Sequence, residues 1–337
     1  MEASEEKILE MIAYEAFIKR ASEINMPFML KGSYSTRQYF PNPMDRLPSD
    51  IDWVYMERLN NQEDATNIFD SWVIAITELE NNDGVEFNSF RKNQFWRMMD
   101  YAMADDFPTV NTDLICWVDE KEIQFTLDIS FNLDIEYPPI PLTYKPLRGE
   151  SFIVLNSVPL SLQISWKIHQ TLVRPRFKDL FDLILLVQHS TFNNDEREQA
   201  LQALINECSA DNIDLNRLSW FLSNKIEKLF INNSIEDHWN FWRHGVKGSD
   251  FYKYHEMYHF DMAENITDAS KLPQNLSVFL NEFGLAMQNA GFNIQLMEHL
   301  PEAKRQQRKT YEQPTVQEET KIEKRNTVIS YLKGLFK

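Results

Sequence analysis

The sequence of 337 residues is poor in glycine and cysteine, with 8 glycines and 2 cysteines. The glycines form neither a GxxxxGK[ST] nor a GxGxxG pattern, so the sequence contains no P-loop and no Rossmann dinucleotide fingerprint. Cys116 and Cys208 are too few to build a cysteine-based zinc cluster, and so low a number is typical of a reducing compartment. The chemistry of any site must therefore come from other residue types.

Long apolar runs and a surplus of basic residues are also missing. The best apolar run is 183–187, far below the roughly 18 residues of a membrane span, and the acidic N-terminus does not resemble a signal peptide. We therefore expect a cytoplasmic protein without membrane contact. The 34 Lys and Arg face 51 Asp and Glu, and the net charge of −17 excludes a general nucleic-acid coat protein but not a local basic groove.

The apolar patterns predict two domains and a tail. An α/β domain, a mixed sheet with flanking helices, is expected over 1–155, and a mainly helical domain over 156–300. Residues 301–337 predict a flexible basic tail with a short amphipathic helix near its end. The proline-rich stretch 138–146 predicts a linker or domain edge. We expect strands at 26–30, 49–55, 85–90, 95–101, 114–118 and 123–131, and helices at 4–24, 64–80, 159–173, 177–189, 194–208, 214–230 and 275–291.

Three aspartates form the pattern with the clearest chemistry. Asp50 and Asp52 follow a Gly-Ser turn after a gap of sixteen residues, and their spacing places both carboxylates on one face of a strand. Asp128 lies in an apolar strand, where its neighbours Phe125, Leu127, Ile129 and Phe131 would face the opposite way. Three such carboxylates could bind two Mg²⁺ (or Mn²⁺) ions and support an in-line phosphoryl displacement. In the alternative interpretation, Asp50 and Asp52 form a solvated strand end and Asp128 ends a hairpin.

Two motifs together resemble a known family. The Gly32-Ser33 turn, the Asp-x-Asp pair and the later strand aspartate are similar to the active-site pattern of nucleotidyltransferases related to DNA polymerase beta. Leu30-Lys31-Gly32-Ser33 resembles the LKGG or LKGS opening of the AbiEii/AbiGii toxins within that superfamily. The segment 167–183 resembles their K…R…(R/K)D-x-x-D-L signature through Lys167, Arg174, Lys178, Asp179 and Asp182. The resemblance covers about residues 25–190, and its departures, Ser33, Pro175 and Lys178, remove no metal ligand.

The resemblance implies a bacterial toxin of a toxin–antitoxin or abortive-infection (phage-defence) system. Such an enzyme would transfer a nucleoside monophosphate from an NTP to an acceptor hydroxyl, with RNA such as a tRNA end favoured and a protein or small molecule still open. A cognate antitoxin would be its protein partner. The nucleotide is expected in a cleft between the two predicted domains.

The resemblance also suggests residue roles. Gly32 and Ser33 would bind the triphosphate, and Asp50, Asp52 and Asp128 would hold the metal, with Asp128 able to accept the proton of the attacking hydroxyl. Lys167 and Arg174, two helical turns apart, would direct cations toward the phosphates, beside Lys178. Asp179 and Asp182 would brace those cations or act as a base. The alternative for this segment is an exposed salt-bridged helix face.

The sequence also contains a motif that is typical of a second class of enzyme. His255-Glu256-Met257-Tyr258-His259 is a literal HExxH, which on a helix could bind Zn²⁺ as in metalloproteases, with Glu282 as a possible third ligand. The surrounding segment 238–260 is dense in aromatics, so packed or surface histidines are the favoured interpretation. A third possibility is a catalytically silent nucleotidyltransferase fold that binds an antitoxin partner.

Overall fold

The computed structural model describes residues 5–99, 108–211, 213–230, 235–244, 270 and 272–299. These residues divide into two compact units. The sheet unit contains 5–38 and 48–159, and the helical unit contains 39–47 and 160–299. The predicted tail at 301–337 and the HExxH motif at 255–259 lie outside the described residues.

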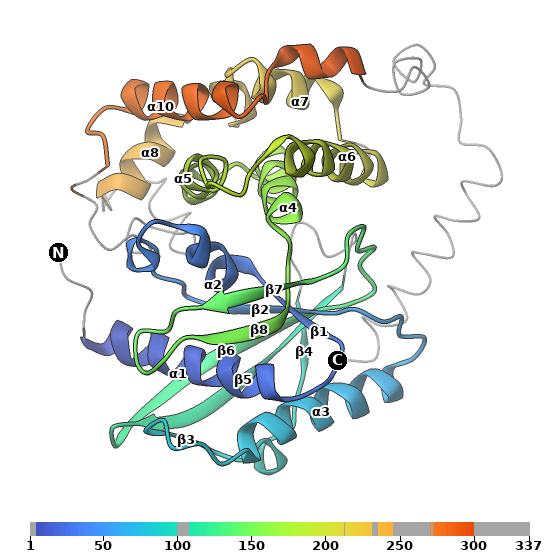
Figure 1. Cartoon of the computed structure of the whole chain (residues 1–337), viewed down its shortest axis with the longest axis vertical. Coiled ribbons are helices and arrows are strands. Elements are labelled where there is room, and N and C mark those ends of the chain that lie inside the picture. Colours follow the sequence, from blue (N-terminus) through green and yellow to red (C-terminus); the bar gives the residue numbers. More distant parts are fainter. Residues whose placement is uncertain are drawn as a thin grey trace. The chain divides into compact units, whose positions relative to one another are not determined.

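The sheet unit is built around one mixed sheet, labelled in Figure 1. The strand order is β3-β5-β6-β2-β1-β8-β7, with β4 paired to β5. β2 runs parallel to β6 and antiparallel to β1, which itself runs parallel to β8. The strands are β1 (Phe28–Lys31), β2 (Ile51–Tyr55), β3 (Val85–Phe87), β4 (Arg97–Met98), β5 (Thr109–Val118), β6 (Lys121–Ser130), β7 (Ile140–Tyr144) and β8 (Phe152–Ser157).

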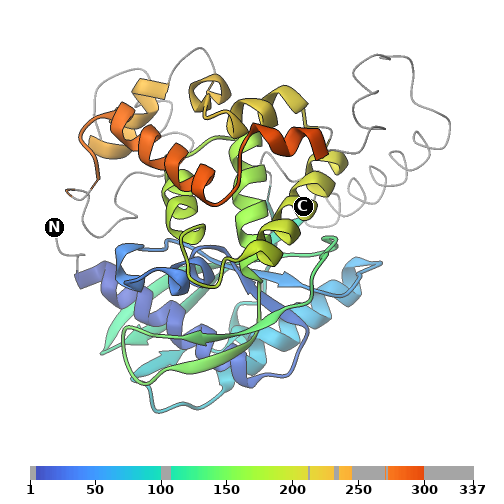
Figure 2. The same cartoon turned by 45° about the horizontal axis from the view of Figure 1, so that its top comes forward.

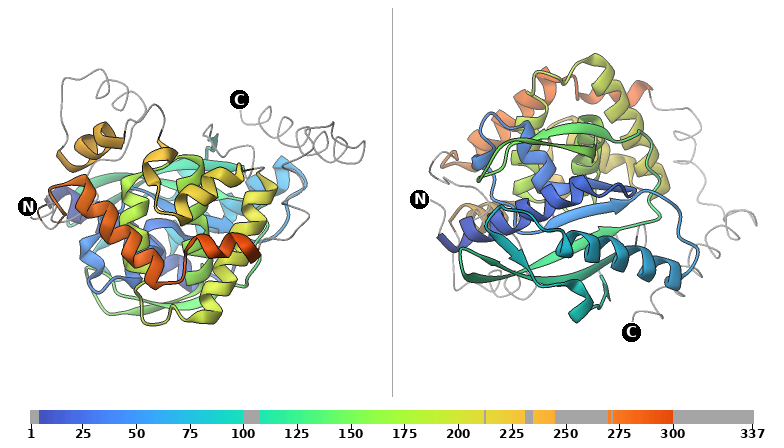
Figure 3. Two further views of the ribbon diagram at one scale, coloured as in Figure 1. Left: turned by 90° about the horizontal axis from the view of Figure 1, so that it is seen from above. Right: turned by 60° about the horizontal axis from the view of Figure 1, so that its bottom comes forward.

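Helices α1 (Glu5–Glu23) and α3 (Gln62–Glu78) cover one face of this sheet, as the right-hand view of Figure 3 shows. The side chains of β6 at 125, 127 and 129 are buried in the core with both helices, as the alternation in the sequence predicts. Trp72 of α3 stacks on Phe28 of β1 and meets Trp53 of β2 edge to face. This packing fixes the two strands whose ends carry Gly32 and Asp52.

The mixed α/β class is confirmed, but two features of the sheet differ from prediction. The proline-rich stretch is not a linker, because it contributes strand β7, whose partner β8 was also missed. Prolines are tolerated there because β7 is an edge strand of the sheet and needs fewer backbone donors. The Gly-Ser turn opens a short helix, α2 (Gly32–Thr36), which 3-10 turns at Arg37–Tyr39 and Pro43–Asp45 follow.

The helical unit matches the predicted helices with one exception. α4 (Leu160–Val173) packs against α5 (Phe177–Leu186) and α6 (Asn194–Ala210), and α10 (Leu276–Asn289) packs against α5 (Figure 2). The helix expected at 214–230 is instead α7 (Leu215–Leu222) followed by a 3-10 turn, Ile226–Leu229. Asn224 between them has φ +53°, a left-handed conformation that ends an α-helix. The remaining elements are α8 (Ile235–His244) and the 3-10 helix Ile294–His299. None of the described helices is long and apolar enough to cross a bilayer.

Candidate functional site

Strand pairing in the sheet unit brings two of the three predicted acidic residues together. Asp52 of β2 lies directly opposite Asp128 of β6 and, on its other side, opposite Lys31 of β1. Asp50 precedes the first residue of β2, and its chain is tied to α1 because the Tyr14 hydroxyl donates to the Ser49 carbonyl at 2.9 Å. Asp128 is inside β6, so the hairpin-end interpretation is wrong.

The carboxylate of Asp128 is held in an unfavourable environment for its charge. Burial is the main cause, and the neighbouring charges of Asp52 and Asp50 add to it, so the pKa of Asp128 rises to about 8, although Lys31 and Arg97 oppose the shift. Its Oδ1 atom is buried and has no hydrogen-bond partner among the described residues. A cation beside these carboxylates would supply the missing partner and stabilise the ionised form.

Gly32 allows the turn after β1 to approach Asp52 closely. Its φ is +71°, which favours glycine. A Cβ atom at this position would lie 2.8 Å from Asp52 Cγ and closer still to its Oδ2. The next residue, Ser33, is largely buried, and its hydroxyl has no hydrogen-bond partner in the described part of the chain. The turn therefore brings a backbone and an unsatisfied hydroxyl next to the acidic residues.

Two basic residues without a predicted role flank the carboxylates. Lys31 Nζ is 3.2 Å from Asp52 Oδ1. Arg97 of β4 donates from Nε to Asn111 Oδ1 at 2.9 Å, and Asn111 lies opposite Asp128. Arg97 also pairs with Asp113 at 2.6 Å. Lys31 belongs to the LKGS motif, which could have indicated that it lies near Asp52. Arg97 belongs to no motif.

The oxygen ligands and burial of this group fit a divalent metal ion. Carboxylates are the preferred ligands of Mg²⁺ and Mn²⁺, and the unsatisfied Asp128 oxygen is a ready donor. Asp50 lies one residue before β2, so strand alternation orients only Asp52 and Asp128, and Asp50 acts on Asp128 through its charge.

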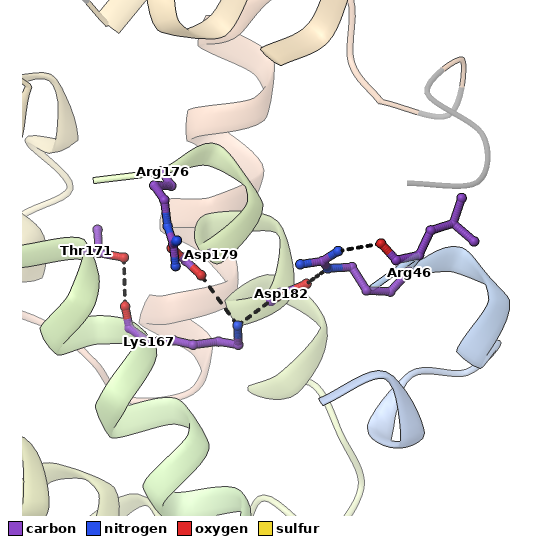
Figure 4. A network of polar contacts seen from close by, with 7 residues as sticks. Arg46, Lys167, Thr171, Arg176, Asp179 and Asp182 are labelled. Atoms are coloured by element: carbon purple, nitrogen blue, oxygen red, sulfur yellow. Dashed lines mark hydrogen bonds and ion pairs between the residues drawn. The ribbon is translucent and has the colours of Figure 1, made fainter. Parts of the chain in front are cut away.

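In the helical unit, the residues of the second motif form a buried polar network (Figure 4). Lys167 Nζ of α4 is 2.7 Å from Asp182 Oδ2 and 3.5 Å from Asp179 Oδ1, both on α5. Arg176 donates to Asp179 at 2.6 Å. Asp179 and Asp182 are fully buried, so the alternative of an exposed salt-bridged face is wrong for them.

The charges of this network favour the ionised form of Asp179. Burial by itself raises the pKa of Asp179, but the nearby cations Arg176 and Lys167 outweigh it and hold the pKa well below its usual value. An unexpected member is Arg46, which donates from Nε to Asp182 Oδ1 at 3.1 Å. Arg46 is 136 residues away in sequence and carries no motif, so no sequence signal could have found it.

The other two predicted cations lie at the junction of α4 and α5. α4 ends at Val173, and Arg174 directly follows it, with its backbone N–H still donating to the Gln170 carbonyl at 2.7 Å. The helix stops before Pro175, and α5 begins at Phe177, as expected from the restrictions that proline imposes. Lys178 lies in the first turn of α5, one residue before Asp179.

Comparisons with known proteins place the chain in a family. Among solved structures, JHP933 from Helicobacter pylori is 15% identical, with a TM-score of 0.48 and coverage of 88% of this chain and 97% of that chain. MenT4, the nucleotidyltransferase toxin Rv2826c from Mycobacterium tuberculosis H37Rv, is 13% identical, with a TM-score of 0.47 and coverage of 85% and 84%. A search of curated proteins finds no match. The profile described as "Nucleotidyl transferase AbiEii toxin, Type IV TA system" matches residues 17–253. The chain therefore belongs to the AbiEii nucleotidyl transferase toxins of type IV toxin–antitoxin systems.

Proposed function

We propose that this nucleotidyl transfer enzyme uses Mg²⁺ to move a nucleoside monophosphate from an NTP to an acceptor hydroxyl. Membership of the family implies an NTP substrate, a divalent metal and an antitoxin partner. The observation that carries the finer proposal is the cross-strand pair of Asp52 and Asp128: Asp128 Oδ1 has no hydrogen-bond partner among the described residues, and the Gly32 turn lies against Asp52.

Each residue of the sheet unit has a role in this proposal. Asp50, Asp52 and Asp128 would hold the metal ion, which supplies charge neutralisation at the phosphates when bound. The Gly32 backbone and the Ser33 hydroxyl would bind phosphate oxygens, because the turn offers close approach and an unsatisfied donor. Asp128 is also suited to accept the proton of the attacking hydroxyl, because its Oδ1 atom has no hydrogen-bond partner among the described residues.

The network of the helical unit suggests different roles for the residues of the second motif. An ammonium group has three N–H donors, and Asp182 and Asp179 take two from Lys167. Among the described residues the third has no partner, and we propose that it binds an anionic substrate group. Asp182 holds both Lys167 and Arg46, so we assign it to positioning these cations rather than to proton abstraction. Arg174 and Lys178 would add positive charge for the triphosphate.

The acceptor and the biological setting follow from the family resemblance. RNA, with a tRNA end favoured, is the proposed acceptor, and abortive infection is the proposed setting. The protein would be incubated with Mg²⁺, each of four α-labelled NTPs, and purified tRNA, total RNA or protein extract. An Asp50→Ala/Asp52→Ala double variant is the control. Label on tRNA with the intact protein alone is expected. Label on protein would overturn the RNA acceptor, and no label on any fraction, with the antitoxin absent, would overturn the proposed transfer.

A further inference from the structure

A buried cluster in the helical unit combines one histidine with two carboxylates, apart from the residues discussed above. His169 belongs to α4, Glu207 to α6, and Asp211 directly follows the last residue of α6. One possible ligand atom from each lies within 4.8 Å of the others. No other group of three His, Cys, Asp or Glu side chains among the described residues has its possible ligand atoms this close together.

The packing of α4 against α6 explains how these side chains meet. Glu207 and Asp211 are four residues apart, so they share one face of α6, the face that packs on α4. Two carboxylates at this spacing repel each other by an amount that destabilises a helix unless a positive charge lies between them. His169 lies where one of its ring nitrogens could bind a cation placed between these carboxylates.

The histidine and one carboxylate lie close together without a hydrogen bond between them. His169 is 1% exposed, and its Nε2 lies 2.7 Å from Asp211 Oδ2. Neither atom makes a hydrogen bond within the described part of the chain, although the two are close enough for an ion pair when the ring is protonated. A buried nitrogen and a buried oxygen that face each other in this way cost free energy, and a shared cation would satisfy both.

Glu207 is oriented by a neighbour. Trp166, one turn before His169 on α4, donates from Nε1 to Glu207 Oε1 at 3.2 Å. A hydrogen bond to a ligating carboxylate is a common feature of metal sites, where it fixes the direction of the remaining oxygen. The same helix turn therefore supplies a ligand and the group that orients another ligand.

We propose that His169, Glu207 and Asp211 bind a divalent transition-metal ion, with Zn²⁺ the best match. A neutral imidazole and two carboxylates carry a charge of −2, which a divalent ion cancels. Mixed nitrogen and oxygen ligands favour zinc over Mg²⁺, which prefers oxygen alone. Three protein ligands leave a fourth position for water. The site would link α4 to α6, and α4 also carries Lys167, so the ion would stiffen the helix that presents that cation. This proposal does not depend on the proposed function.

Zinc content and thermal stability test the proposal in the full-length protein. Metal-free protein, prepared with a chelator, is compared with the same protein after addition of one equivalent of Zn²⁺ and removal of excess ion. We expect close to one zinc per chain by elemental analysis. At zinc concentrations about a hundredfold above the dissociation constant, we expect the melting temperature to rise by about 5 to 10 °C. Mg²⁺ at the same concentration should not reproduce the rise.

Shape-conserving variants separate this site from others. Asp211→Asn and Glu207→Gln should each lose most of the bound zinc and the zinc-dependent stabilisation. His189→Ala, which removes another histidine of the helical unit that contacts Thr191, is the matched control and should keep both. His255→Ala in the HExxH motif should also keep both. If a variant does not fold, the visible spectrum of Co²⁺-loaded wild-type protein, and its loss on addition of Zn²⁺, still decides whether a nitrogen-containing site exists.

Two results would overturn the proposal. The first is wild-type protein that binds no stoichiometric zinc and melts at the same temperature with and without it, which would leave His169 and Asp211 as a buried ion pair. The second is zinc that disappears in His255→Ala and remains in Asp211→Asn, which would move the metal to the HExxH motif.

Discussion

Asp52 and Asp128 are direct neighbours on parallel strands, with Lys31 opposite Asp52 on the far side. The same row continues from Asp128 through Asn111 to Arg97. Two adjacent carboxylates are therefore flanked by one cation at each end of a row that crosses five strands. The flanking cations offset part of the repulsion between the two carboxylates. The offset is incomplete at Asp128, because its Oδ1 atom has no hydrogen-bond partner among the described residues.

We predict that Asp128→Asn stabilises the metal-free protein while it abolishes transfer. Asparagine keeps the shape of the side chain, whereas the aspartate must lose its charge because burial and two acidic neighbours disfavour the ionised form. Urea denaturation at pH 8 in the presence of a chelator measures the stability. Asp134→Asn, at a side chain that is 90% exposed and pairs with Arg58, should leave it unchanged. A less stable Asp128→Asn protein would mean that the aspartate is a structural residue.

We predict that Gly32→Ala reduces both stability and transfer, because the added Cβ collides with the Asp52 carboxylate. Gly149→Ala is the matched control: its φ is +89°, so it pays the same left-handed strain of about 1 kcal/mol, but nothing lies within 4 Å of the added atom. Thermal melting should show a larger loss for Gly32→Ala than for Gly149→Ala, and only Gly32→Ala should lower the transfer rate. Equal losses in both variants would show that close approach to Asp52 does not matter.

We predict that Asp182→Asn destabilises the protein by about 3 kcal/mol, because it removes the buried negative charge that pairs with Lys167 and Arg46. Urea denaturation of wild type and variant at pH 7 measures the difference. The double variant Asp182→Asn/Lys167→Met should be less destabilised than the sum of the two single changes, because it removes both charges of a contacting pair. Additive losses would contradict the direct contact.

The stability of the helical unit should depend on pH through Asp179. Its cationic neighbours Arg176 and Lys167 outweigh burial and hold its folded-state pKa below the unfolded value of about 3.9. A carboxyl with a lowered folded pKa contributes stability that is present above the unfolded pKa and lost as pH falls toward the folded pKa. The free energy of unfolding of wild type minus that of Asp179→Asn should therefore shrink between pH 5 and pH 3. A constant difference over that interval would mean that the pKa of Asp179 is not lowered.

Much of the sheet was predictable because strand alternation is a local property. The apolar side chains of β6 and the position of Asp128 on the opposite face follow from period-2 spacing alone. β7 could not be predicted, since a proline-rich segment is a typical loop and only an edge position makes a strand possible. The break at Asn224 depends on one left-handed residue, which no periodicity reveals.

The candidate site was predictable where its residues form motifs. Asp50, Asp52 and Asp128 have spacings that indicate a metal site, and strand pairing then puts Asp52 next to Asp128. Arg46 and Asn111 could not be found in this way, because their partners are distant in sequence and neither belongs to a motif. The cluster at His169 was hidden for the same reason: its ligands come from two helices that only packing brings together.

The most direct test of the account measures Mg²⁺-dependent label transfer from α-labelled NTP by wild type, Asp52→Asn, Asp128→Asn and Asp134→Asn at matched protein concentration. We predict that both Asp52→Asn and Asp128→Asn lose at least about a hundredfold in transfer rate while circular dichroism stays native, and that Asp134→Asn retains full activity. Transfer by Asp52→Asn or Asp128→Asn at the wild-type rate would contradict the assignment of the cross-strand aspartate pair to the active site.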